Sequence, residues 1–146
     1  MSIAAILRSK GHAITTVGPL TTIAEVCSIL ADHRIGALPV TDDADQGIIL
    51  GMLSERDIVR VIALHGPAAL VLTAEQVMTR HIRTASPRAS VSEAMELMTQ
   101  GRFRHLPVVE GGRMVGLVSI GDVVKERIDQ ALQEADSLKA YVAGSV

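Results

Sequence analysis

The chain has 146 residues, of which 48% are hydrophobic and 21% charged, a balance typical of one compact domain or of two half-size modules that share a core. Its formal net charge of −2 gives no overall positive field for nucleic acid or an anionic membrane, so any anion site has to be made locally. The aromatic residues Phe103 and Tyr141 are too few to form stacking platforms for single-stranded nucleic acid.

The rest of the composition predicts a cytoplasmic protein without a membrane partner. The longest apolar runs, such as residues 48–53, fall far short of the roughly 20 residues that span a bilayer. At the N-terminus the basic residues follow a short apolar run, which is opposite to the order in a secretory signal. The single cysteine, Cys27, excludes an internal disulfide and is expected to be a buried hydrophobe.

The first half of the chain predicts a short helix followed by the order strand, helix, strand, strand, helix. Apolar spacing, capping boxes and turn residues define these elements. In chain order they are a helix from Ile3 to Ser9, a strand from Ala13 to Val17, a helix from the Thr22–Glu25 capping box to about His33, strands at Ala37–Thr41 and Ile48–Leu53, and a helix from Ser54 that ends by Gly66.

The second half repeats this order after a packed crossing. Residues 68–72 are unusually apolar for a linker, and a capping box follows at Thr73–Gln76, so we expect the two halves to form one body. The repeated elements are a strand near Ile82–Thr84, a helix from Ser90, strands at Leu106–Val109 and Met114–Val118, and a long helix from Ser119 to about Tyr141.

The halves are copies of each other. Pro39 and Pro107 lie 68 positions apart, and the same shift aligns the surrounding Leu-Pro-Val strands and much of the preceding sequence. Asp57 and Asp122 lie 65 positions apart, so the first copy carries three extra residues within 41–47, as expected for a surface turn. We expect an N-terminal helix over residues 1–10, a first module over 11–72 and a second over 73–146.

Each copy contains the pattern Gly, two apolar residues, Ser, two variable residues and Asp, at Gly51–Asp57 and Gly116–Asp122. A carboxylate can accept hydrogen bonds from both hydroxyls of a ribose, and the hydroxyl and free N–H groups at a helix start suit an anion. The alternative is that Ser and Asp only cap the following helix, as Thr22 and Ser90 do elsewhere. The recurrence of Asp rather than Glu in both copies favours binding.

Together, the paired Leu-Pro-Val strands and the paired Gly-to-Asp turns resemble those of the CBS (cystathionine-β-synthase-type) domain, two of which form a Bateman module. The resemblance covers the whole chain, and small single-pair proteins of bacteria and plant organelles are especially similar. It implies an α/β fold of two β-α-β-β-α modules related by pseudo-two-fold symmetry. It also implies adenine-nucleotide binding in clefts between the modules, with Ser54, Asp57, Ser119 and Asp122 at the ribose.

Further candidates lie beside these turns. Thr16 and Thr84, at matching strand ends, could hydrogen-bond ribose or phosphate, or could be ordinary strand-end polarity. The backbone at Gly36-Ala37 and at the equivalent Arg104-His105 could contact an adenine ring, and the side chains of Arg104 and His105 are assigned to the second site, which we therefore expect to bind phosphorylated ligands more tightly. Arg56 and Lys10 could neutralise phosphate, with simple solvent exposure as the alternative.

The sequence therefore predicts a regulatory sensor that binds an AMP-, ATP- or NAD-type nucleotide as a ligand, without a prosthetic group or metal, and signals to a separate regulated protein. The alternative is an interaction scaffold with degenerate sites. An enzyme is not expected, because the nucleophile-elbow pattern and a His-x-x-x-His metal pair are both lacking. We expect a homodimer, since the apolar helix stripes exceed what such small modules can cover alone.

Overall fold

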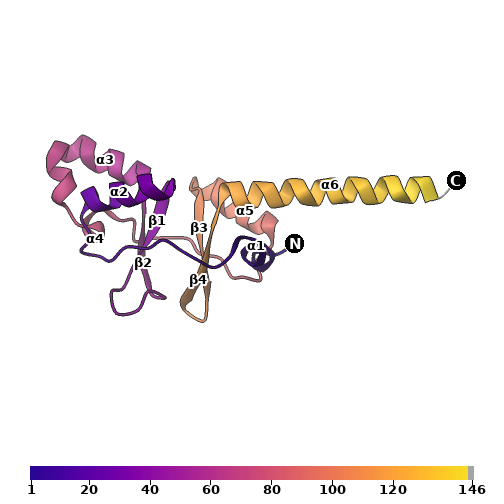
Figure 1. Ribbon diagram of the computed structural model, residues 1–146, viewed down its shortest axis with the longest axis horizontal. Helices are drawn as coiled ribbons and strands as arrows, with labels where there is room; N and C mark the ends of the chain where they lie inside the picture. Colours follow the sequence, from indigo (N-terminus) through magenta and orange to yellow (C-terminus); the bar gives the residue numbers. More distant parts are fainter. Residues whose placement is uncertain (145–146) are drawn as a thin grey trace.

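Two similar units, each a β-hairpin with two helices packed beside it, lie side by side in the computed structural model, which describes residues 1–144 (Figure 1). The first unit consists of α2 (Ile23–His33), β1 (Ala37–Thr41), β2 (Ile49–Ser54) and α3 (Glu55–His65). The second consists of α5 (Val91–Gly101), β3 (His105–Glu110), β4 (Arg113–Ser119) and α6 (Ile120–Gly144). The predicted α/β duplication is confirmed, and the ends of these elements differ little from those expected.

Three short elements connect and flank the two units. Helix α1 (Ile3–Lys10) precedes the first unit, while the 3₁₀ helix η1 (Gly66–Val71) and the one-turn helix α4 (Ala74–Val77) join the two. Ala69 and Ala74 in this connection are fully buried, so the crossing is packed as predicted. No helix of residues 1–144 combines the length and apolarity needed to cross a membrane.

The strands predicted at 13–17 and 82–84 are wrong, because each is reduced to a single parallel bridge, Val17 to Val40 and Ala85 to Val108. The cause lies in the Leu-Pro-Val strands. Val17 donates to the Pro39 carbonyl and accepts from Thr41 N, but extending this ladder towards residue 15 would need an N–H at Pro39, which proline lacks. Pro107 blocks the equivalent extension beside Ala85 in the same way.

Each unit is completed by a segment from outside its own repeat. Ile3, Ile6 and Leu7 of α1 are buried in the core of the second unit, together with side chains of α5, β3, β4 and α6. Ala74 and Met78, at α4, are buried in the core of the first unit. The N-terminal helix thus closes the second unit, and the connection closes the first. How the chain divides into domains at residues 10 and 72 stays a prediction.

Close packing of these closing segments explains the first residue of both repeated motifs. A Cβ on Gly51 would lie 2.7 Å from the carbonyl oxygen of Thr79, which accepts a hydrogen bond from Met52 N in the same contact. A Cβ on Gly116 would lie 2.6 Å from a methyl carbon of the buried Leu7. Both glycines therefore allow close backbone packing, which is a structural role and requires no ligand.

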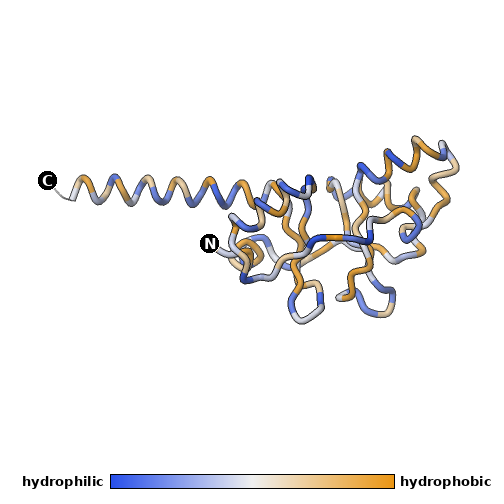
Figure 2. Tube along the Cα trace, turned by 180° about the vertical axis from the view of Figure 1, so that it is seen from behind, coloured by the Kyte–Doolittle hydropathy of each residue, from blue (hydrophilic) through white to orange (hydrophobic). Residues whose placement is uncertain are grey.

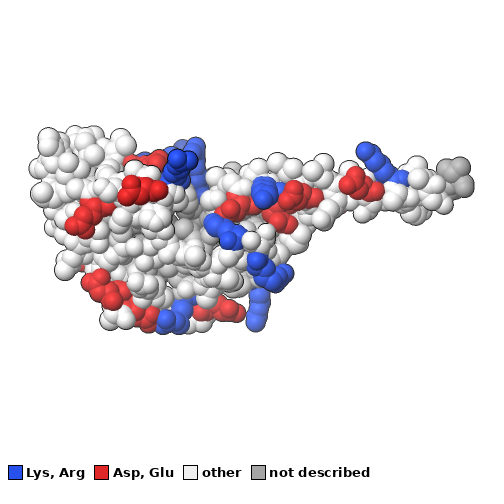
Figure 3. All heavy atoms as spheres, viewed as in Figure 1, with Lys and Arg blue, Asp and Glu red and all other residues white. Residues whose placement is uncertain are grey.

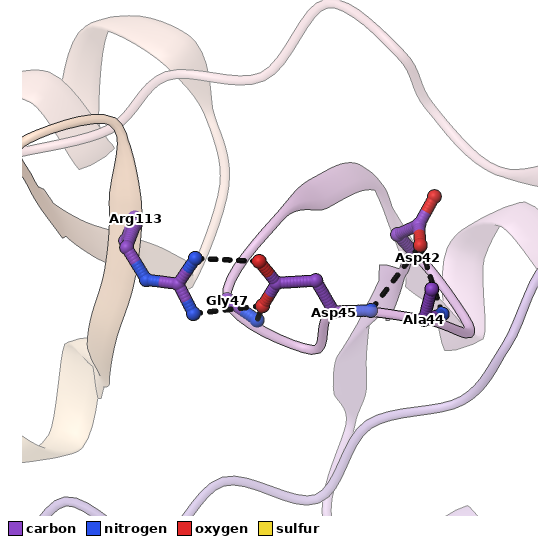
Figure 4. A network of polar contacts seen from close by, with 5 residues as sticks. All are labelled: Asp42, Ala44, Asp45, Gly47 and Arg113. Carbon is purple, nitrogen blue, oxygen red and sulfur yellow. Dashed lines mark hydrogen bonds and ion pairs between the residues drawn. The ribbon is translucent and has the colours of Figure 1, made fainter.

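The two hairpins are tied together at the ends remote from α3 and α6. The Arg113 guanidinium makes two hydrogen bonds to the Asp45 carboxylate, at 2.5 and 2.7 Å, and Gly47 N donates to the same carboxylate (Figure 4). The Arg113 hydrogen bonds and then that of Gly47 lower the pKa of Asp45 to about 2. Met114 N also donates to the Gly47 carbonyl, at 2.8 Å. The three-residue insertion in the first copy thus contacts the second module.

The long helix α6 leaves the body of the molecule after its first turns (Figure 1). Val123 is fully buried in the second core, whereas every residue from 131 to 144 is exposed. Apolar residues nevertheless recur along the projecting part (Figure 2). Because it is exposed throughout, the projecting part is little supported by the rest of the chain. A helix of this length without such support is only marginally stable in water.

The Gly51→Ala variant should be destabilised, because the new methyl group meets a backbone carbonyl that cannot move without breaking the contact between Met52 and Thr79. Overpacking of this kind costs about 1–3 kcal/mol in the free energy of unfolding, measured by urea denaturation. Gly121→Ala is the control, because its Cβ would only touch Ser119 Oγ at 3.6 Å within a helix. Equal stabilities of the two variants would contradict the packing role of Gly51.

Candidate functional site

A cleft of about 620 Å³ lies between the two modules, within the range of volumes that hold small-molecule ligands. Its lining comes from the end of the first hairpin and the start of α3, from the segment after α4, and from the loop between α5 and β3. These residues are Gly36, Ala37, Met52, Ser54, Glu55, Arg56, Asp57, Arg60, Thr79, His81, Ile82, Arg83, Gly101, Arg102, Phe103, Arg104, His105 and Pro107.

The Ser54–Asp57 turn supplies the acidic group of this cleft. The Asp57 carboxylate accepts from Ser54 N at 2.9 Å and from Ser54 Oγ at 3.0 Å, while Asp57 N donates back to Ser54 Oγ. Its other oxygen, Oδ1, accepts from Thr79 Oγ1 at 3.2 Å. The turn is therefore a capping box, as the structural alternative required, and its carboxylate also lines the cleft with acceptor capacity to spare.

The equivalent turn in the second module has a different neighbour. Asp122 caps α6 through Ser119, and the ammonium of Lys10 lies 2.5 Å from Asp122 Oδ2 while also donating to the Leu117 carbonyl at 2.8 Å. Burial raises the pKa of Asp122, but the hydrogen bonds from Lys10 and Ser119 outweigh it, and the pKa lies below the usual value. A cation from the chain itself thus pairs with the carboxylate that was predicted to hold a ribose.

The structure places the residues at the starts of β1 and β3 in one cleft, whereas the sequence predicted two separate sites. Gly36-Ala37 and Arg104-His105 do not belong to separate sites but line the same cleft, with the Cβ position of Gly36 only 3.6 Å from His105 Cε1. Both backbones are used in equivalent ways, since the Gly36 carbonyl accepts from Glu55 N and the Arg104 carbonyl from Ile120 N. Arg104 and His105 are therefore placed beside Asp57 in the cleft.

The cleft brings together seven of the predicted site residues, namely Gly36, Ala37, Ser54, Arg56, Asp57, Arg104 and His105. Lys10, Ser119 and Asp122 form the separate cluster at the second turn. Thr16 is half-buried and Thr84 exposed, and neither lines the cleft. These two threonines directly precede Val17 and Ala85, which form the isolated parallel bridges to β1 and β3.

Sequence reasoning missed several lining residues: Glu55, Arg60, Thr79, His81, Arg83 and Arg102. A signal existed for one of them, because Arg60 follows Arg56 by four positions and so lies on the same helix face. The segment 79–83 gave none, since a strand was predicted to begin at its end, near Ile82. Its position at the cleft depends on the crossing, where Met52 and Thr79 exchange backbone hydrogen bonds.

His105 is the titratable group of the cleft whose environment is most clearly altered. Burial lowers its pKa below 6.5, and the positive charge of Lys10 acts in the same direction, while the carboxylates of Asp122 and Glu55 oppose them. The neutral imidazole therefore dominates near pH 7 and can both donate and accept a hydrogen bond.

Residues 1–144 contain no group of three His, Cys, Asp or Glu side chains placed to hold a metal ion. The charged and titratable groups in the cleft are arginines and histidines, which can donate hydrogen bonds to an anion, and two carboxylates, which can accept from hydroxyl groups.

Comparison with known families identifies the repeated unit. The sequence model of the CBS domain matches residues 10–64 and again residues 74–129. The chain therefore belongs to the CBS-domain family, as a pair of such domains. The match stops at residue 129, so the projecting part of α6 lies beyond it.

Two curated relatives carry the same domain in their names. The chain is 34% identical over 125 residues to the mitochondrial CBS domain-containing protein CBSX3 of Arabidopsis thaliana, covering 84% of this chain and 61% of the plant protein. It thus spans less than two thirds of that relative. The CBS domain-containing protein YhcV of Bacillus subtilis is 36% identical over 110 residues, covering 75% of this chain and 76% of the relative.

Solved structures share the fold. A CBS-domain protein of Agrobacterium tumefaciens is 42% identical with a TM-score of 0.82, covering 87% of this chain and 99% of that one. A CBS domain protein of Pyrobaculum aerophilum, complexed with AMP, has 28% identity and a TM-score of 0.74 over 84% and 89% of the two chains. A CBS domain pair complexed with 5′-methylthioadenosine and S-adenosylmethionine has 26% identity and a TM-score of 0.76 over 89% and 98%.

The lowered pKa of His105 predicts a loss of stability on mild acidification. Below about pH 6.5 the unfolded chain binds a proton at this residue that the folded chain does not, so the free energy of unfolding falls as the pH drops towards the folded-state pKa. Above that window His105 is neutral in both states and does not contribute to the pH dependence of the free energy of unfolding. Urea denaturation between about pH 7.5 and 5.5 should show a shallower decline for His105→Gln than for the wild type. Parallel curves for the two proteins would contradict the burial of a neutral imidazole.

Proposed function

We propose that the chain is a regulatory module that binds an adenine nucleotide in the cleft between its two CBS domains. The observation that carries the proposal is the Asp57 carboxylate, held by Ser54 and Thr79 at the wall of a cleft of about 620 Å³ that both domains line. Such a carboxylate can accept from the two hydroxyls of a ribose. The neighbouring arginines then lie where phosphate groups need them.

Bound ligands in similar proteins support the same class. One structural neighbour is complexed with AMP and another with 5′-methylthioadenosine and S-adenosylmethionine, so adenosine is the part that their ligands share. The protein reports ligand binding to a separate regulated protein through a change in the angle between its domains. A ligand shifts such an equilibrium only by its difference in affinity for the two arrangements.

The two repeated turns should contribute unequally. Asp57 faces a hydroxyl, Thr79 Oγ1, whereas Asp122 is already paired with the ammonium of Lys10. A ribose at Asp122 would bind a carboxylate whose charge the ammonium already neutralises, whereas a ribose at Asp57 would bind beside a neutral hydroxyl. The tighter site is therefore the cleft at Asp57, with Arg104 and His105, and not the second turn as expected from the sequence.

Asp57→Ala should weaken AMP binding measured by calorimetry by about tenfold to hundredfold, because a charge-assisted hydrogen bond of roughly 1.5–3 kcal/mol is lost. Asp122→Ala is the matched control, since it removes the same cap from the equivalent turn and should leave the tighter binding event unchanged. Circular dichroism confirms that both variants are folded. If AMP binds equally well to Asp57→Ala and the wild type, the turn is only a cap.

The alternative is a constitutive scaffold with degenerate sites. It predicts no heat of binding with AMP, ADP, ATP, NAD or S-adenosylmethionine, while partner binding persists without ligand. The open cleft, with a carboxylate in its wall that has an acceptor site left beyond its contacts with Ser54 and Thr79, favours the sensor. No catalytic role, prosthetic group or nucleic-acid partner is proposed, and a location in the cytoplasm stays a prediction.

We also propose that the functional unit is a homodimer in which the domain helices of two copies join in a flat disc. Exposed apolar side chains on α3 support this assembly, with Val59 at 67% and Leu64 at 75% exposure. Helix α6 supplies a second surface. Val124, Ile128, Ala131, Ala135 and Leu138 follow each other at alternating spacings of four and three, the repeat of a coiled coil.

Charge selects the orientation of two α6 helices. In a parallel pair, Glu134 of one copy lies beside Lys139 of the other, and the same attraction occurs twice. An antiparallel pair in the register that aligns the apolar residues brings the two Glu134 side chains together instead. The charges therefore favour a parallel pair.

Light scattering behind size exclusion should give the wild type a mass near twice the 15.5 kDa of one chain at micromolar concentration. Ile128→Glu, which places a charge on the apolar stripe of α6, should shift the mass towards the monomer. Gln133→Glu adds the same charge on the opposite face of the helix and should not. A wild-type mass of 15.5 kDa would contradict the dimer, and an unaffected Ile128→Glu dimer would contradict the role of α6.

A further inference from the structure

Five arginines surround the cleft without a partner. Arg56 and Arg60 come from α3, Arg83 from the segment after α4, and Arg102 and Arg104 from the loop between α5 and β3. Within residues 1–144, none of these guanidinium groups has a hydrogen bond or ion pair, and the ion pairs found there are Lys10 with Asp122 and Arg113 with Asp45. Lys and Arg side chains gather above the hollow between the modules (Figure 3).

This local charge contrasts with that of the whole chain. Five of the fourteen Lys and Arg residues line one cleft, opposed there by Glu55 and Asp57, while the chain as a whole has a net charge of −2. With neutral histidines the lining therefore carries an excess of three positive charges. Solvation explains one exposed arginine well, but it does not explain why five converge from three separate segments on a concave surface.

The unliganded protein bears a cost for this arrangement. Arg56 and Arg60 are four residues apart on α3, where like charges destabilise a helix. Arg102 also has a left-handed backbone conformation, with φ of 55°, which non-glycine residues rarely adopt. Its counterpart Arg34 in the first module has the same conformation, with φ of 54°, but lies outside the cleft lining. The conformation is thus a feature of the fold, and the charge at the cleft is specific to Arg102.

We propose that this cleft selects adenine nucleotides with two or three phosphates over AMP. The inference rests on the proposed function and adds the ligand class, because AMP has about two negative charges near neutral pH and ATP about four. One phosphate group cannot contact guanidinium groups contributed from both modules as fully as a polyphosphate chain can. A ligand with a positive sulfonium centre, such as S-adenosylmethionine, is disfavoured by the same charges.

A polyphosphate would also bridge the two modules. The ribose is held at Asp57 of the first module, and the phosphate chain extends towards Arg83, Arg102 and Arg104, which the second half of the chain contributes to the cleft. Charge-assisted hydrogen bonds of this kind increase affinity by about tenfold for each added phosphate. Because the arginines are exposed, the preference for ATP over AMP should decrease as salt screens these charges.

Calorimetry of the full chain with AMP, ADP, ATP and inorganic tripolyphosphate at low and high salt tests the inference. The expected order is ATP, then ADP, then AMP, with roughly tenfold steps at low salt. Arg102→Asn should reduce the affinity for ATP by about fivefold to tenfold and that for AMP by less than twofold. Arg34→Asn is the matched control, since asparagine tolerates the left-handed conformation in both places, and it should change neither affinity.

The outcomes separate the inference from the proposed function. AMP that binds as tightly as ATP, or an ATP affinity that Arg102→Asn and Arg34→Asn leave equally unchanged, overturns the preference for polyphosphates and leaves the nucleotide site intact. Tripolyphosphate that binds as tightly as ATP overturns adenine recognition. No binding of any nucleotide overturns both proposals.

Discussion

The structure depends on the exchange of closing segments between the two repeats. Each hairpin has a glycine where another backbone or a buried side chain must approach closely, and in each case the approaching segment comes from outside that repeat. The segment after α4 pairs with β2 at Met52, while α1 packs over Gly116 with Leu7. These contacts decide what lies next to each acidic turn, because Thr79 and Lys10 belong to the two closing segments.

A duplicated sequence has in this way produced two unlike sites. The Ser and Asp of both turns make nearly the same hydrogen bonds, so the difference lies in what each carboxylate meets next, a hydroxyl in one case and an ammonium in the other. Divergence of the closing segments alone is enough to give one carboxylate a neutral neighbour and the other a cation. The arginines increase this difference, since they converge on the cleft that contains Asp57.

Much of this arrangement follows from sequence patterns, and the exceptions have physical causes. The capping boxes at Ser54, Ser90 and Ser119, the hairpins and the long last helix were predictable, because each depends on neighbours close in sequence. The strands at 13–17 and 82–84 were not formed, since their pairing depended on an N–H that a proline of another strand lacks. Arg83 and Arg102 could not be assigned to a site either, because only the packing of the two modules brings them to the cleft that contains Asp57.

The tie between Asp45 and Arg113 has a mechanical consequence. It joins the hairpins at the ends opposite the cleft, together with the hydrogen bond from Met114 to Gly47, so the proposed change in angle between the domains would turn about that edge and alter the width of the cleft. Helix α6 is fixed to one side of this edge by Val123 and is about 37 Å long, from its 25 residues. Under the proposed change in angle between the domains, a rotation of about 10° would move the tip of α6 by roughly 6 Å, so the helix would enlarge small movements at the cleft.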